Sequence, residues 1–183
     1  MDSWGQTGRR RVILAAGATL MACAAPRKLH AAEGPPLLVT RGPPLETPAV
    51  GWTTADGAAR TLADYAGQAV VLNFWATWCI PCVAEMPALD ALARLMEPER
   101  ISVLALSSDR GGATAVARFY VERGIQSLPV LLDPRGTAAR AFGAKGIPTT
   151  VLIDRAGQER ARVEGAIDWA SPASVARLRE VVA

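Results

Sequence analysis

Short apolar runs constrain the fold of this 183-residue chain more than any other feature. AVVLNFW at 69–75, ISVLALS at 101–107 and PVLLD at 129–133 are nearly free of charge and rich in valine and leucine. Such runs are typical of strands buried on both faces of a sheet. Leucines and methionines at helical spacing follow at 80–96, and an amphipathic stretch ending in a glycine follows at 112–124. This alternation predicts a layered α/β fold.

The last third of the chain predicts a hairpin and a closing helix. TTVLID at 149–154 and ERARVEG at 159–165 flank a turn that contains a glycine, which predicts two antiparallel strands. A short helix is expected around 135–142, and a last helix from Ser171-Pro172 to Val182, because serine caps helices and proline suits their first turn. The hairpin makes the central sheet mixed. We therefore expect a mixed sheet flanked by helices.

The first 32 residues are typical of an export signal or membrane anchor. Three arginines precede the apolar run at 12–25, which is shorter than the roughly 20 residues of a membrane-spanning helix. Residues 33–48 form a predicted Pro-rich linker, and 49–183 a single domain. From residue 33 onward 15 basic residues face 16 acidic ones. That balance leaves no basic patch to indicate nucleic-acid binding.

The N-terminal segment allows three outcomes. Arg10-Arg11 resembles a twin-arginine signal, with cleavage expected near Ala31 or Ala32. LMAC at 20–23 resembles a lipobox, in which Cys23 would become the lipidated first residue of a tethered protein. The third outcome is an uncleaved membrane anchor. All three place the domain in the periplasm or another extracytoplasmic compartment.

Cys79 and Cys82 form a C-x-x-C pair at the junction between a predicted strand and a predicted helix. Such a pair can be a metal site, a structural disulfide or a redox couple. The only histidine, His30, precedes the predicted domain, so Cys-His nucleophilic sites are excluded there, and a four-ligand zinc site is disfavoured. We expect no metal, although two thiols could still bind copper(I).

A structural disulfide is also disfavoured, because a disulfide that encloses two residues constrains the unfolded chain little. The strand-to-helix position instead favours a redox couple. Cys79 would lie at the helix N-terminus, where free N–H groups stabilise a thiolate. We therefore predict Cys79 as the attacking thiol and Cys82 as the resolving thiol. Pro81 between them lies in the first helical turn, where its missing N–H is harmless.

Glu85 follows Cys82 by three residues and so shares its helical face. If Glu85 is buried, its pKa rises and it could exchange a proton with Cys82. The alternative is a solvated helix residue. Trp78 is expected either to shield the disulfide and contact a partner or to pack in the core. Phe74 and Trp75 are expected in the core.

The motifs VVLNFWATWCIPC, the AEMP that follows, and GIPTTVLID at 146–154 together resemble the TlpA/ResA-like thioredoxin-fold disulfide reductases. The resemblance covers 49–183. It implies a thioredoxin fold with an N-terminal β extension and a βα-type insertion at 108–127. It also implies a cis peptide before Pro148 beside the disulfide, with Ile147 and Pro148 contacting substrate; a turn proline is the alternative.

The resemblance also suggests how protons move. Thioredoxins carry a buried aspartate six residues before the first cysteine, and Asn73 stands there in this chain. Asparagine cannot ionise, so it can only support the site. The TlpA/ResA-like family assigns the proton-transfer role to the glutamate that corresponds to Glu85.

These features predict an extracytoplasmic thiol–disulfide oxidoreductase that reduces partner proteins and needs no cofactor beyond its own Cys79–Cys82 couple. By resemblance its clients are apocytochrome c or the thiols of copper-site assembly proteins, and a membrane thiol protein supplies its electrons. A thiol peroxidase is a second hypothesis, although the P-x-x-x-T-x-x-C arrangement is absent. A copper(I)-carrying binding module is the third.

Overall fold

The structure, a computed structural model, describes residues 38–39 and 43–183. The predictions for the export segment, Cys23 and His30 lie outside these residues. Within the described part, the strands form one mixed sheet in the order β1-β9-β8-β5-β6-β7-β3-β4, and β2 also pairs with β9. The strands are β1 (Leu38–Val39), β2 (Leu45–Glu46), β3 (Gly51–Thr54), β4 (Ala59–Thr61), β5 (Ala69–Trp75), β6 (Ile101–Ser107), β7 (Leu131–Leu132), β8 (Thr149–Ile153) and β9 (Gln158–Glu164).

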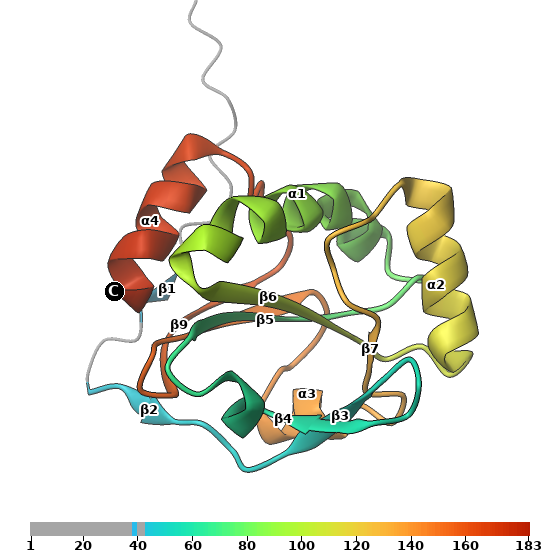
Figure 1. The fold of residues 1–183 in the computed structure, drawn as a ribbon, viewed down its shortest axis with the longest axis horizontal. Coiled ribbons are helices and arrows are strands. Elements are labelled where there is room, and N and C mark those ends of the chain that lie inside the picture. Colours follow the sequence, from blue (N-terminus) through green and yellow to red (C-terminus); the bar gives the residue numbers. More distant parts are fainter. Residues whose placement is uncertain (1–37, 40–42) are drawn as a thin grey trace, which may run out of the picture. The chain divides into compact units, whose positions relative to one another are not determined.

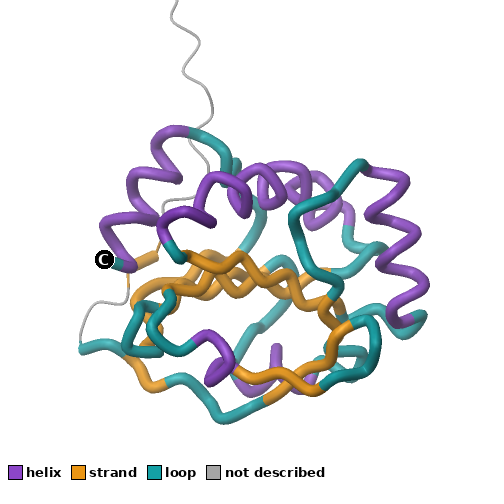
Figure 2. The backbone as a smooth tube through the Cα atoms, in the orientation of Figure 1, coloured by secondary structure: helices purple, strands orange, loops and turns teal. Residues whose placement is uncertain are grey.

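The helices lie on both faces of this sheet (Figures 1 and 2). One face carries a core cluster beneath α1, α2 and α4, and the other a cluster beneath α3, β3 and the 3-10 helix η1. The thioredoxin fold with flanking helices is therefore confirmed. The helices are α1 (Ile80–Met96), α2 (Gly112–Arg123), α3 (Thr137–Ala141) and α4 (Pro172–Val182), with 3-10 turns η1 (Leu62–Tyr65) and η2 (Glu97–Glu99).

β5 is the central strand that positions the site. All seven of its residues are buried, as expected for a strand covered on both faces. It pairs in parallel with β6 and antiparallel with β8, so two strands flank the point where the chain enters α1. Phe74 and Trp75 are buried core residues, as predicted. The first residue of α1 therefore follows a rigid strand by only a short loop.

Several predicted elements agree with the structure. Both β5 and β6 match their predicted bounds, and α1 matches the helix predicted at 80–96. The Ser171 side chain caps α4 by accepting a hydrogen bond from the Ser174 backbone N–H, as its sequence indicated. The predicted hairpin is β8 with β9. The N-terminal β extension is the β3–β4 hairpin, which pairs with β7.

Other elements differ from the prediction. The strand expected at 129–133 is only Leu131–Leu132, because Pro129 has no N–H to donate to a neighbouring strand. The insertion expected at 108–127 contains α2, and β7 follows after its predicted end. Within the predicted linker, β1 and β2 pair with β9, since extended chain can extend a sheet edge.

Candidate active site

The two cysteines form a disulfide at the start of α1, with sulfurs 2.07 Å apart. Cys79 is the N-cap residue, and its Sγ accepts a hydrogen bond from the Cys82 backbone N–H at 3.3 Å. This donor and the helix dipole both stabilise negative charge on Cys79. Cys79 is 7% exposed and Cys82 is fully buried, so only Cys79 can be reached by an incoming sulfur.

A second segment of chain lies against Cys79. The peptide bond between Ile147 and Pro148 is cis, as the resemblance implied. The Ile147 carbonyl oxygen is 3.7 Å from Cys79 Sγ, although the two residues are 68 positions apart in the sequence. Pro148 is buried and Ile147 half-buried. The turn is held because Thr149 Oγ1 donates to the Gly146 carbonyl at 2.7 Å.

Exposed apolar side chains lie next to Cys79 in the sequence. Trp78 is 68% exposed and Ile80 is 84% exposed, and Pro81 is also on the surface. The alternative that Trp78 packs in the core is therefore wrong. Large exposed apolar side chains beside a reactive group are typical of a surface that binds another protein. Together with the half-buried Ile147, they offer such a surface next to the disulfide.

Glu85 lies in a buried polar cluster one helical turn beyond Cys82. It is 3% exposed, so the alternative of a solvated helix residue is wrong. Asn73 Nδ2 on β5 donates to Glu85 Oε1 and to Thr150 Oγ1, each at 2.9 Å. The indole Nε1 of Trp169 donates to Glu85 Oε2 at 3.3 Å. Each carboxylate oxygen of Glu85 therefore accepts a hydrogen bond.

Burial raises the pKa of Glu85 from its ordinary 4.5 to about 7. Removing the carboxylate from water is the largest influence, and the hydrogen bonds from Asn73, the Ile167 backbone and Trp169 oppose it. A carboxyl group with a pKa near neutrality can accept and return a proton under ordinary conditions. Its position on the buried side of α1, in the turn after Cys82, suits that exchange.

Another carboxylate holds the loop that carries the cysteines. Asp109 follows β6 and is 4% exposed. Its Oδ2 accepts from the Thr77 backbone N–H at 2.9 Å, and its Oδ1 accepts from Thr77 Oγ1 at 2.6 Å. Ser107 Oγ also donates to Asp109 at 2.7 Å. Asp109 thus fixes the backbone two residues before Cys79.

Sequence reasoning missed Thr77, Asp109, Thr150 and Trp169. Asp109 offered one signal, because it follows the end of a predicted parallel strand, where functional side chains gather. Trp169 offered none, since it lies in a loop and its contact with Glu85 spans 84 residues. Among the described residues, no group of three or more His, Cys, Asp or Glu side chains could hold a metal. Copper(I) binding by two thiols stays a prediction.

Comparison with known proteins places this site in a family. The model of the AhpC/TSA family matches residues 43–161, well over half of the chain. The chain belongs to the AhpC/TSA family. The chain is similar to the thiol-disulfide oxidoreductase ResA of Geobacillus thermodenitrificans, at 33% identity over 110 residues, or 60% of this chain and 62% of the relative. ResA of Bacillus cereus is 31% identical over 113 residues, covering 62% and 64%. The matches thus span about three fifths of the curated relatives.

Solved structures of thiol–disulfide proteins are similar to this chain. A putative thiol:disulfide interchange protein DsbE from Chlorobium tepidum is similar over 77% of this AhpC/TSA-family chain and 95% of its own, with a TM-score of 0.64 and 27% identity. The exposed lipoprotein thioredoxin of Streptococcus pneumoniae is similar over 73% and 99%, with a TM-score of 0.59 and 28% identity. The resemblance to TlpA/ResA-like proteins is confirmed.

Asp109→Asn tests whether the Thr77 contact matters for chemistry. Asparagine keeps one acceptor oxygen, so we expect the free energy of unfolding to fall by roughly 1 to 3 kcal/mol. We also expect slower reduction of a disulfide substrate, because the loop before Cys79 loses an anchor. Urea unfolding and initial rates measure the two effects.

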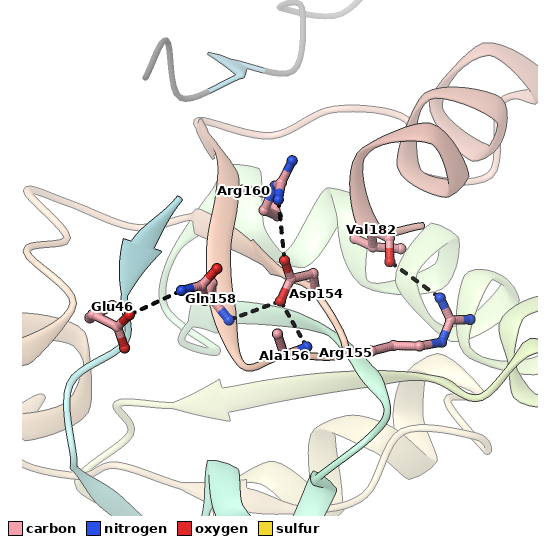
Figure 3. A network of polar contacts seen from close by, with 7 residues as sticks. All are labelled: Glu46, Asp154, Arg155, Ala156, Gln158, Arg160 and Val182. Atoms are coloured by element: carbon pink, nitrogen blue, oxygen red, sulfur yellow. Dashed lines mark hydrogen bonds and ion pairs between the residues drawn. The ribbon is translucent and has the colours of Figure 1, made fainter. Parts of the chain in front are cut away.

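Asp154→Asn is the matched control. Asp154 is 8% exposed and accepts from the backbone N–H groups of Ala156 and Gln158, at 2.9 and 3.0 Å (Figure 3). It follows β8 at the end opposite to Pro148, away from the disulfide. This variant should lose stability without slowing the reaction. Equal rates for the two variants would show that Asp109 only stabilises the fold.

Proposed function

We propose that this protein is an extracytoplasmic thiol–disulfide oxidoreductase that reduces disulfides in partner proteins through Cys79 and Cys82. The observation that carries the proposal is one juxtaposition. A helix-capping, slightly exposed Cys79 lies against the cis-Pro148 turn, and the buried Glu85 lies one turn beyond the buried Cys82. The ResA relatives, named thiol-disulfide oxidoreductases, support the same reaction class.

In the first step, the Cys79 thiolate attacks one sulfur of the client disulfide. A bond forms between Cys79 Sγ and that sulfur, the client S–S bond breaks, and the other client sulfur leaves as a thiolate that takes a proton. The Cys82 N–H, 3.3 Å from Cys79 Sγ, stabilises the attacking charge. The product is a mixed disulfide between the two proteins.

In the second step, Glu85 accepts the proton of the Cys82 thiol, and the resulting thiolate attacks Cys79 Sγ. The bond between Cys79 Sγ and the client sulfur breaks. That client sulfur leaves as a thiolate and is protonated, and the Cys79–Cys82 disulfide remains. Two electrons have passed to the client. No cofactor takes part, and a membrane thiol protein would reduce the pair again.

The clients we propose are oxidised apocytochrome c or the oxidised thiols of copper-site assembly proteins. The apolar surface of Trp78, Ile80 and Ile147 suits an extended client segment that carries its disulfide over Cys79. Trp78, Ile147 and Pro148 would contact that segment. Asn73 and Pro81 would support the site, Asn73 through Glu85 and Pro81 through the first turn of α1.

We propose that the domain works outside the cytoplasm, exported by its N-terminal segment or tethered there through Cys23. One solved relative is named an exposed lipoprotein thioredoxin, which supports such a location. Among the described residues, the structure has no helix of the length and apolar character needed to cross a membrane.

The reduction potential of the Cys79–Cys82 pair tests the direction of the reaction. We expect a value below about −200 mV, typical of a reductant, whereas a value near about −120 mV would indicate an oxidase. The protein is equilibrated with glutathione buffers of known ratio, and the fraction of disulfide is measured. Cys82→Ser, which cannot form the pair, sets the baseline.

Two further assays separate the alternatives. Rapid peroxide consumption without disulfide reduction would favour the thiol peroxidase. Copper retained after dialysis, together with no reduction of insulin, would favour the copper(I) carrier. The proposed function requires insulin reduction that depends on both cysteines.

A further inference from the structure

Trp169 lies in the loop between β9 and α4, and it is fully buried. Its indole N–H points at a carboxylate: Nε1 donates to Glu85 Oε2 at 3.3 Å. The contact joins the C-terminal part of the chain to the helix that carries the cysteines. A buried hydrogen bond to a charged oxygen is stronger than one to a neutral group.

A hydrogen bond to the indole N–H is not a general feature of the buried tryptophans in this protein. Trp52 and Trp75 are also buried, at 4% and 0% exposure, and their indole nitrogens have no hydrogen-bond partner among residues 38–39 and 43–183. The fold therefore tolerates unpaired indole N–H groups. Trp169 differs from both because its N–H meets the Glu85 carboxylate, the first one that follows Cys82 on α1.

The groups around Glu85 are hydrogen-bond donors. Asn73 approaches from β5, and the Ile167 backbone and Trp169 approach from the loop before α4. Cys82 lies one turn earlier on the same helix and is disulfide-bonded here, and no charged side chain among the described residues shifts the pKa of Glu85. With Asn73 on Oε1 and Trp169 on Oε2, the carboxylate plane is held at two points.

We propose that Trp169 is a positioning residue that holds the Glu85 carboxylate in its charged form and in fixed orientation, ready to take the proton of Cys82. The inference rests on the role of Glu85 in the proposed function. Without the indole N–H, Oε2 loses its donor, and the carboxylate binds a proton more tightly. Less of the protein then carries a base beside Cys82 at neutral pH.

Trp169→Phe removes the N–H and keeps an aromatic ring. We expect the midpoint of the Glu85 titration, followed by 13C NMR of its side-chain carboxyl carbon, to rise by about one pH unit, as for the loss of one hydrogen bond to a charged group. Trp52→Phe is the matched control, because it removes an indole N–H that has no partner in the described part of the chain. Its midpoint should equal that of the wild type. Equal midpoints in all three proteins would overturn the proposal.

A measurement on the wild type covers the case in which Trp169→Phe does not fold. The Nε1–H resonance of Trp169 should titrate with the same midpoint as the Glu85 carboxyl carbon, while that of Trp52 stays constant. Glu85→Gln should abolish the Trp169 titration. A Trp169 Nε1–H chemical shift that does not change with pH would overturn the proposal.

These NMR measurements use the oxidised protein without a client, so they decide the role of Trp169 even if disulfide reduction fails. When the wild type does reduce clients, a third readout applies. Trp169→Phe should raise the pH midpoint of mixed-disulfide resolution by the same amount as the Glu85 midpoint, and Trp52→Phe should leave it unchanged. An unshifted resolution midpoint in Trp169→Phe would contradict the proposal.

Discussion

Cys82→Ser is expected to accumulate as a mixed disulfide with its client, and Cys79→Ser is expected to form none. Cys79 is the cysteine with exposed surface, at 7% against 0% for Cys82, so the client sulfur must join Cys79. In Cys82→Ser the second attack is impossible, and the complex persists. Both variants should reduce insulin only at the uncatalysed background rate. Non-reducing electrophoresis, followed by mass spectrometry of the linked peptides, identifies the sulfur that carries the client.

The double variant with serine at both positions is the control, and it should trap nothing. The assignment of roles is wrong if Cys79→Ser traps clients and Cys82→Ser does not. Serine is close in size to cysteine, and Cys79 caps α1 through a side chain that serine can replace as an acceptor. Both single variants should therefore fold, so a missing adduct reports chemistry.

Glu85→Gln is expected to remove most of the loss of stability that the oxidised protein suffers between about pH 4.5 and about pH 7. In the folded protein the pKa of Glu85 is raised to about 7 by burial, and its ordinary value is 4.5. Between these values the unfolded chain has released the proton and the folded protein still holds it, so stability falls as pH rises. The full difference is on the order of 3 kcal/mol.

Urea unfolding at several pH values measures this effect. The free energy of unfolding of the wild type should decline across the window, and that of Glu85→Gln should decline much less. Glu122→Gln is the matched control, since Glu122 is exposed on the solvent face of α2 and pairs with Arg118 at 2.7 Å. Parallel curves for Glu85→Gln and the wild type would mean that Glu85 titrates alike in the folded and unfolded chains.

Local sequence patterns were enough to predict the frame of the site. The seven apolar residues of β5 and the helical spacing of α1 set the strand-to-helix junction, and with it the different exposure of Cys79 and Cys82. β5 and α1 are long and have periodic apolar patterns, so the local sequence is enough to predict their type and bounds. The cis peptide at Pro148 followed from resemblance, because residue spacing alone also allows a turn proline.

Contacts across the fold could not be predicted in this way. The hydrogen bonds of Asn73 to Thr150 and of Trp169 to Glu85 join residues 77 and 84 positions apart. No periodicity encodes such pairs, since tertiary packing brings them together. For the same reason, the pairing of β1 and β2 with β9 could not be predicted within the expected linker.

The small exposed area of Cys79 has a consequence for the kind of client that it can reach. With 7% of Cys79 exposed and the Ile147 carbonyl 3.7 Å from its sulfur, an incoming disulfide must protrude to reach it. A bridge packed inside a finished, folded protein cannot protrude in this way, whereas one on a chain that has not yet folded can. Under the proposed function, steric shape alone would thus spare disulfides packed inside folded proteins and direct electrons to chains that have not yet folded.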